Sequence, residues 1–199
     1  MKRYILTLII AVFALMQAAA QTYDNLWKQA DIIARKDQPR SEIGVMKKII
    51  SKASAAKDYG QLLAAEMRQM ILWKEISADS LMPNVERMEA EVLKVKDPAL
   101  KAVRYAVLGK VYRDMDEKKS EEFFKKALQQ PELLAKHTST EYIPLTLKGV
   151  DGSSFNNDLL HLIGFEADSK EAYHLMYTYY NKVGNRGAAC LCAYKLIEK

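Results

Sequence analysis

The sequence predicts an all-α protein made of antiparallel helix hairpins stacked as an array. From Tyr23 onward, apolar residues recur at intervals of three and four, which is the period of an amphipathic helix. No segment alternates apolar and polar residues over a useful length, as a half-buried strand would, and glycine and proline stand where helices need to stop. With 199 residues, 49% of them hydrophobic, the chain can bury a core without disulfides or a structural metal.

The chain begins with the three-part pattern of a secretory signal peptide. The basic pair Lys2-Arg3 precedes an apolar run and then a group of alanines. The alternative is a membrane anchor, but the apolar run is shorter than the roughly 20 residues that span a bilayer. We therefore expect residues 1–20 to be removed by cleavage between Ala20 and Gln21. The mature protein would be soluble, exported, and periplasmic or associated with the cell envelope, with no membrane span.

Six helices are predicted in the first part of the mature chain, residues 21–131. The first two lie around 23–33 and 43–53. They form a hairpin, because Pro39 between them suits the first turn of a helix, where its missing N–H costs nothing. A break at Gly60 precedes the third helix.

The remaining helices of this part follow from breaks and caps. The sequence SADSLMPN separates the third helix from the fourth, which continues to Val95. Asp97 followed by Pro98 is typical of an N-cap and a first-turn proline. We therefore expect the fifth helix over 99–115 and the sixth over 120–130.

Residues 132–154 are predicted to form a long connection with little periodicity. The connection is either a flexible linker or a strap that lies on the helices. We favour the strap, because a disordered linker rarely contains so many apolar residues. The apolar residues in question are Tyr142, Ile143, Leu145 and Leu147.

Residues 155–199 are predicted to form a C-terminal helical pair, with two or three helices in all. Asn157 or Asp158 would cap a helix that Gly164 ends, and Asp168 would open the next helix. Because the helical pattern continues to the last residue without a polar cap, we expect the array to be truncated here.

The composition argues against a nucleic-acid partner. Removing the two basic residues of the signal peptide lowers the formal charge from +5 to +3, since 30 − 2 = 28 lysines and arginines remain against 25 acids. Lysine pairs such as Lys47-Lys48 and Lys125-Lys126 are interleaved with acids and apolar residues, whereas a phosphate-binding surface needs cations gathered on one face. These lysines are expected on solvated helix faces.

The sequence contains no motif for catalysis, metal binding or cofactor binding. The three histidines are more than ten residues apart and lack the spacing of zinc ligands. Cys190 and Cys192 lie two apart in a helical pattern, which turns their side chains to different sides, so we expect packed thiols rather than a disulfide. The enzymatic alternative is Asp158 with His161 on one helix face, but no nucleophile accompanies this pair. We expect a non-enzymatic protein without a cofactor.

Fixed offsets in the segment LGKVYRDMDEKKSEEFFKKALQQP, residues 108–131, resemble a tetratricopeptide repeat. The matching residues are Leu108, Gly109 and Tyr112 in L-G-x-x-Y, and Phe124, Ala127 and Pro131 in F-x-x-A-L-x-x-P. In that family two helices cross at a small residue, with large residues on either side and a closing proline. Gly109 would allow the close approach, and Tyr112 and Phe124 would fill the volume beside it. Ser120 stands at the small position of the second helix.

A second copy of this spacing lies near the end of the chain. Tyr180 is followed by Gly184 and Ala189 at the intervals that the repeat uses. The early hairpin fits only in helix length and apolar period, with Ile43 where a small residue is expected. The resemblance implies a degenerate array, an α-α superhelix, whose concave face holds an extended peptide or another domain.

Longer phrases resemble the helical N-terminal region of large exported bacterial alpha-2-macroglobulin-like proteins. They are YDNLWKQADIIARKDQPRSEIGVMKKII, SADSLMPNVERMEAEV, KDPALKAVRYAVLGKVY and FNNDLLHLIGFEA. The resemblance implies a docking or spacer module ahead of β-domains, in a protein that traps peptidases. Its partners would be the downstream macroglobulin domains, a peptidase or an envelope protein. The alternative is a self-contained tetratricopeptide-like adaptor of the envelope that holds a partner peptide in its groove.

Overall fold

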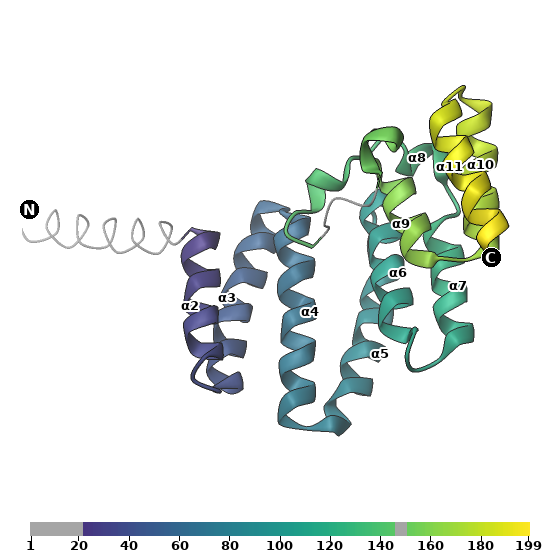
Figure 1. Cartoon of the computed structure of the whole chain (residues 1–199). Coiled ribbons are helices and arrows are strands. Elements are labelled where there is room, and N and C mark those ends of the chain that lie inside the picture. Colours follow the sequence, from purple (N-terminus) through teal and green to yellow (C-terminus); the bar gives the residue numbers. More distant parts are fainter. Residues whose placement is uncertain (1–21, 146–150) are drawn as a thin grey trace, which may run out of the picture.

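The computed structural model describes residues 22–145 and 151–199, and within these ranges the chain is all-α (Figure 1). Ten α-helices and three short 3₁₀ helices follow one another, and no β-strand occurs among the described residues. Consecutive helices pack as antiparallel neighbours, which confirms the predicted all-α array of helix hairpins. The predicted cleavage site between Ala20 and Gln21 lies outside the described residues.

The first three helices form one end of the array. They are α2 (Tyr23–Ala34), α3 (Pro39–Ala56) and α4 (Tyr59–Ile76). Pro39 is the first residue of α3, and the carboxylate of Asp58 caps α4 by accepting a hydrogen bond from the N–H of Gln61. The apolar stripes of the three helices close over a shared core of Leu26, Ala30, Ile43, Val45, Met46, Ile49, Ala65 and Leu72.

The break predicted at Gly60 falls slightly earlier, and this glycine has a different role. The chain turns at Lys57 and Asp58, so Gly60 lies in the first turn of α4. A Cβ at Gly60 would lie 2.6 Å from the carbonyl oxygen of Tyr142. Gly60 is therefore a point of close approach between α4 and the later connection.

The middle of the array contains three more helices. They are α5 (Leu81–Val92), which follows a 3₁₀ turn at Ala78–Ser80, α6 (Pro98–Tyr112) and α7 (Glu117–Ala127). Asp97 caps α6 and Pro98 opens it, as predicted. The predicted ranges 99–115 and 120–130 are wrong at the turn that they share. Asp116 accepts a hydrogen bond from the N–H of Lys119 and so starts α7 three residues early.

The connection after α7 runs over the helices. It contains α8 (Pro131–Leu134) and 3₁₀ turns at Ser139–Tyr142 and Gly152–Phe155. Tyr142 is buried and Leu145 packs against the core. Ile143, predicted to pack, is instead 55% exposed. Its backbone is extended, which turns its side chain away from the side that Tyr142 faces; Leu147 lies outside the described residues.

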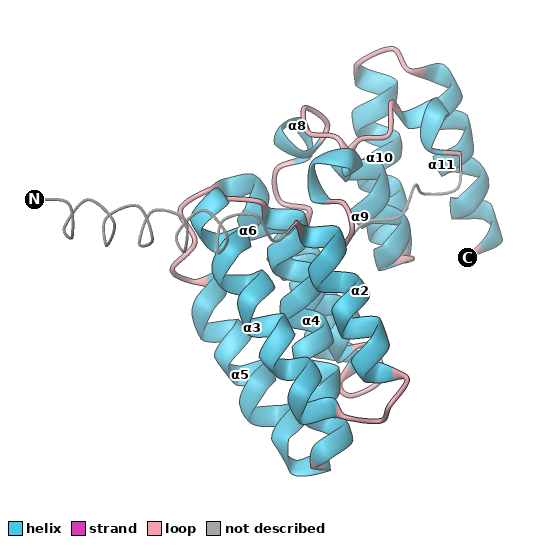
Figure 2. Cartoon of the chain, turned by 90° about the vertical axis from the view of Figure 1, so that its left-hand side faces the viewer, coloured by secondary structure: helices cyan, strands magenta, loops and turns pink. Residues whose placement is uncertain are grey.

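Three helices follow this connection. They are α9 (Leu159–Ala167), α10 (Lys170–Lys182) and α11 (Arg186–Glu198). Asp158 caps α9, because its carboxylate accepts a hydrogen bond of 2.8 Å from the N–H of His161. In Figure 2, α9, α10 and α11 lie beside one end of the body formed by α2 to α6.

Two predicted boundaries in this region are wrong. α9 does not end at Gly164 but continues to Ala167, and Asp168 ends it in the left-handed conformation with φ 50°. Ser169, not Asp168, caps α10. Gly164 instead permits close packing of α9 on α10, since a Cβ there would lie 3.0 Å from Cγ of Met176.

Two further cores hold the rest of the array together. One lies among α4 to α7 and includes Val85, Val107 and Tyr112. The larger one joins α6 and α7 to the connection and to α9, α10 and α11. None of the described helices combines the length and the hydropathy needed to cross a membrane.

Candidate functional site

The predicted crossing of α6 and α7 is a close contact in the structure. A Cβ at Gly109 would lie 2.8 Å from the ring of Phe124. The buried hydroxyl of Ser120 donates a hydrogen bond of 2.7 Å to the carbonyl oxygen of Gly109. Ser120 can therefore take the place of an apolar small residue, because its buried hydroxyl has a hydrogen-bond partner.

The other residues of this predicted unit divide between two cores. Leu108 and Tyr112 belong to the core among α4 to α7, whereas Phe124 and Ala127 belong to the larger core. Tyr112 stacks on the neighbouring Phe123, with ring centroids 5.5 Å apart, and its hydroxyl donates to the carboxylate of Glu89. The α6–α7 pair is therefore packed on two sides. One side contributes to the core among α4 to α7, and the other contributes to the larger core. Pro131 is the first residue of α8.

The second predicted unit lies in the α10–α11 hairpin. Tyr180 and Ala189 are both buried and belong to the larger core. Gly184 lies in the turn with φ +80°, and no side chain or backbone crowds its Cβ position. Gly184 is therefore required for the turn, not for a close helix crossing.

Asp158 and His161 are both in the core, where they support the fold. The carboxylate of Asp158 accepts hydrogen bonds of 2.8 and 3.0 Å from the hydroxyl of Tyr180, in addition to the bond from the N–H of His161. The imidazole of His161 stacks on Phe155, with ring centroids 4.2 Å apart. Burial raises the pKa of Asp158, and burial together with this carboxylate raises the pKa of Tyr180, which therefore stays a neutral donor.

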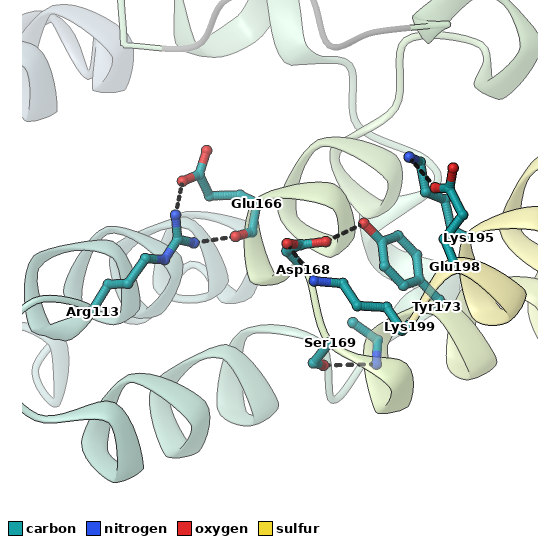
Figure 3. A network of polar contacts seen from close by, with 9 residues as sticks. Arg113, Glu166, Asp168, Ser169, Tyr173, Lys195, Glu198 and Lys199 are labelled. Atoms are coloured by element: carbon teal, nitrogen blue, oxygen red, sulfur yellow. Dashed lines mark hydrogen bonds and ion pairs between the residues drawn. The ribbon is translucent and has the colours of Figure 1, made fainter.

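A polar network fixes the turn between α9 and α10 (Figure 3). Glu166 at the end of α9 accepts a hydrogen bond of 3.1 Å from Arg113 at the end of α6, which also donates to its carbonyl oxygen. Asp168 accepts from the hydroxyl of Tyr173 at 2.7 Å and from Nζ of Lys199 at 2.7 Å. The ammonium of Lys199 lowers the pKa of Asp168. Each bond is partly exposed and weak by itself, but together they tie the turn to α6, α10 and α11.

This turn forms one wall of an open groove between α7 and the first half of α10. The groove has a volume of about 660 Å³. Its floor is apolar and comprises Phe124, Leu128, Ala172 and Leu175. Its rim consists of the exposed residues Lys118, Glu121, Glu122, Lys125 and Glu171, and the wall is completed by Ala167 and Ser169. The groove therefore offers apolar contact between charges of both signs.

Of the residues predicted from the repeat, the structure places Phe124 and Leu128, the first residue and the leucine of F-x-x-A-L-x-x-P, on the floor of this groove. Leu175 and the charged rim were missed. The reason is that α9 packs against both α6 and α7, which spaces α10 away from α7. Leu175 is three residues beyond the buried Ala172 on the amphipathic face of α10, which is the one signal that the sequence offers for it.

The described part of the chain contains no group of three or more His, Cys, Asp or Glu side chains able to hold a metal ion. Both cysteines are free, as predicted; Cys192 is buried, but the prediction of a packed thiol is wrong for Cys190, which is exposed on the side of α11 away from α10. Burial raises the pKa of Cys192 to about 12, so its thiol stays protonated at neutral pH.

Comparison with known proteins does not add a family to this description. No family model matches the chain, and neither a curated protein nor a solved structure is significantly similar to it. The resemblances to the tetratricopeptide repeat and to the macroglobulin-like proteins therefore stay predictions from the residues that suggested them. The groove between α7 and α10 is the feature from which function can be argued.

Proposed function

We propose that this protein is a non-enzymatic docking module that binds an extended segment of a partner protein in the groove between α7 and α10. The observation behind the proposal is the apolar floor of this groove together with its charged rim. Protein interfaces combine an apolar centre with a polar rim in the same way. The volume of about 660 Å³ is enough for several side chains of a partner.

The dimensions of the groove suit a short extended peptide. Lys118 and Lys125 lie seven residues apart on α7, which places them about 10 Å apart along the helix. An extended chain covers this distance in about three residues, because each residue advances by roughly 3.3 Å. The partner segment would therefore place one or two apolar side chains on Leu175 and Phe124. Its acidic residues would lie near the two lysines, and its basic residues near the glutamates of the rim.

The first experiment is selection from a library of random displayed peptides on the purified protein. We expect enrichment of peptides with apolar residues flanked by both acidic and basic ones, because the rim carries two lysines and three glutamates. The variant Leu175→Glu puts a charge on the floor and should lose binding of the enriched peptides at least tenfold. The matched control is His174→Glu, an exposed residue of the same helix that does not line the groove, and it should bind like the wild type. Absence of enrichment, or equal binding by Leu175→Glu, would contradict the proposal.

We also propose that this module is part of a larger protein. The quoted phrases support an exported N-terminal module of a macroglobulin-like peptidase-trapping protein, in which the groove would hold a segment of the downstream domains, a peptidase or an envelope protein. The alternative setting is a self-contained envelope adaptor. Reading the genomic DNA past the codon for Lys199 distinguishes them. A frame that continues into β-domains supports the first setting, and an immediate stop supports the adaptor.

A further inference from the structure

Helix α11 presents a continuous apolar stripe that no described part of the chain covers. It packs on α10 through Ala188, Ala189 and Cys192, and it lies at the edge of the molecule in both views (Figures 1 and 2). The stripe, on the other side, consists of Gly187, Cys190, Tyr194 and Ile197, all exposed. Tyr194 is 58% and Ile197 84% exposed. Their spacing of three, four and three is the spacing of a helix seam that faces a second helix.

Each end of α11 forms a hydrogen bond to another part of the chain. Asn185, before α11, donates a hydrogen bond of 2.9 Å to the carbonyl oxygen of Ser154. After α11, Lys199 pairs with Asp168 at 2.7 Å (Figure 3). The helix is therefore ordered before a partner binds. Binding does not carry an additional entropic cost for ordering it.

We propose that the stripe pairs with the same stripe of a second copy of this chain, antiparallel, around a two-fold axis near residue 192. The four positions are symmetric about that residue. An antiparallel partner therefore places Gly187 opposite Ile197 of the partner subunit and Cys190 opposite Tyr194 of the partner subunit. A small residue faces a large one in every layer, as close packing of two helices requires.

The charged residues at the two ends of α11 favour the same antiparallel orientation. Arg186 and Glu198 are exposed and lie at equal distances on either side of residue 192, and Glu198 also pairs with Lys195 of the same helix at 2.7 Å. Antiparallel pairing brings opposite charges to each end of the seam, and it also opposes the two helix dipoles favourably. Parallel pairing would gather two arginines at one end and two glutamates at the other. It would also oppose glycine to glycine and tyrosine to tyrosine.

The size of the stripe sets the strength of this contact. It extends over the eleven residues from Gly187 to Ile197, about 15 Å of helix. One such seam buries less than the roughly 800 Å² per partner of a standard protein interface. The dimer should therefore be weak and should form only at high protein concentration.

Sedimentation velocity over a range of about 5 to 500 μM tests the surface. The full protein should shift from monomer to dimer, and Ile197→Asp should stay monomeric throughout. Ile32→Asp is the matched control, since Ile32 is 54% exposed on α2 far from the stripe in sequence, and it should behave like the wild type. A wild-type protein that is monomeric at every concentration, or equal dimerisation of Ile197→Asp, would overturn the proposal.

Disulfide trapping tests the orientation, in a background in which Cys190→Ser removes the exposed thiol. The double variant Gly187→Cys with Ile197→Cys should form a covalent dimer under mild oxidation, because the two new thiols meet across the seam only when it is antiparallel. Within one chain they are about 15 Å apart and cannot bridge. Gly187→Cys alone should stay monomeric on a non-reducing gel. Bridging by that single variant, or none by the double variant at concentrations where the wild type dimerises, would refute antiparallel pairing.

Discussion

At the scale of single residues, Gly109 shows how one missing side chain sets the distance between two helices. A Cβ at this position would lie 2.8 Å from the ring of Phe124, so Gly109→Ala must push α7 away from α6. We expect the free energy of unfolding to fall by about 1–3 kcal/mol, the usual cost of overpacking a core. Urea denaturation followed by circular dichroism measures this change.

The matched control for Gly109→Ala is Gly44→Ala. Gly44 lies inside α3, and a Cβ added there would meet nothing within 4 Å. This substitution should raise the free energy of unfolding by about 0.4–1 kcal/mol, because alanine restricts the unfolded chain. Equal effects of the two substitutions would show that helix propensity, not the contact with Phe124, decides the outcome.

Asp158 should make the stability of the fold depend on pH. Its pKa is raised by burial, against the opposing hydrogen bonds from the N–H of His161 and the hydroxyl of Tyr180. An acid with a raised pKa binds its proton more tightly in the folded state. The free energy of unfolding therefore falls as pH rises from the unfolded pKa, about 3.9, through the folded pKa.

The variant Asp158→Asn isolates this effect, since the amide keeps an acceptor for the N–H of His161 and cannot ionise. The wild type should lose stability relative to the variant as pH is raised from about 4, until Asp158 is fully ionised, and the difference should then be constant. Urea denaturation at a series of pH values measures the difference. A wild type that instead gains on the variant with rising pH would show that the hydrogen bonds outweigh burial.

At the scale of helices and turns, the parts of the fold that could be predicted are the ones encoded locally. The apolar periods gave the α-helices, and Pro39, Asp97 and Pro98 marked helix starts correctly, because a cap or a first-turn proline acts within one turn. The start of α7 was predicted wrongly for a local reason as well, since Asp116 is itself a residue type that caps helices and it precedes the predicted start at residue 120.

The features that could not be predicted depend on residues far apart in the sequence. The sequence predicts a break at Gly60 and a helix end at Gly164, but each glycine faces another segment, the backbone of Tyr142 in one case and Met176 in the other. The groove was missed for the same reason. Its floor unites Phe124 with Leu175 only because α9 sets the spacing of α7 and α10.

The contact between α4 and the connection that follows α7 can be tested by substituting Gly60. In Gly60→Ala the new methyl group would meet the backbone of Tyr142, so the connection must lift away from α4. We expect faster hydrogen exchange in residues 139–145, with little change in α2. Mass spectrometry of peptides from the two regions gives the comparison. Unchanged exchange in 139–145 would mean that α4 shifts to accommodate the methyl group.

At the scale of the whole molecule, the groove exists because separate parts of the array are fastened to one another. Arg113 of α6 and Glu166 of α9 hold the turn that forms one wall, and Lys199 holds the same turn from the end of α11. The rim charges predict that peptide binding weakens with salt. We expect the affinity of an enriched peptide with charges of both signs to fall as sodium chloride is raised from 50 to 500 mM, measured by fluorescence anisotropy.

Two substitutions on the rim show which charges cause the salt effect. Lys118→Ala with Lys125→Ala should weaken binding of the enriched peptide and flatten its dependence on salt, because the attraction between these lysines and the acidic residues of the peptide is removed. Lys47→Ala with Lys48→Ala changes the charge equally on α3, away from the groove, and should leave both quantities unchanged. An equal loss in the two double variants would indicate that net charge alone attracts the peptide.

The most direct test of the docking groove is a nuclear magnetic resonance titration of the isotope-labelled protein with the peptide most enriched from the library. We expect backbone amide shifts to concentrate in residues 117–128 and 167–175, from α7 and the start of α10, and to saturate at one peptide per chain. Shifts confined to α2, α3 and α4, or spread evenly over the array without saturation, would contradict the assignment of the groove as the binding site.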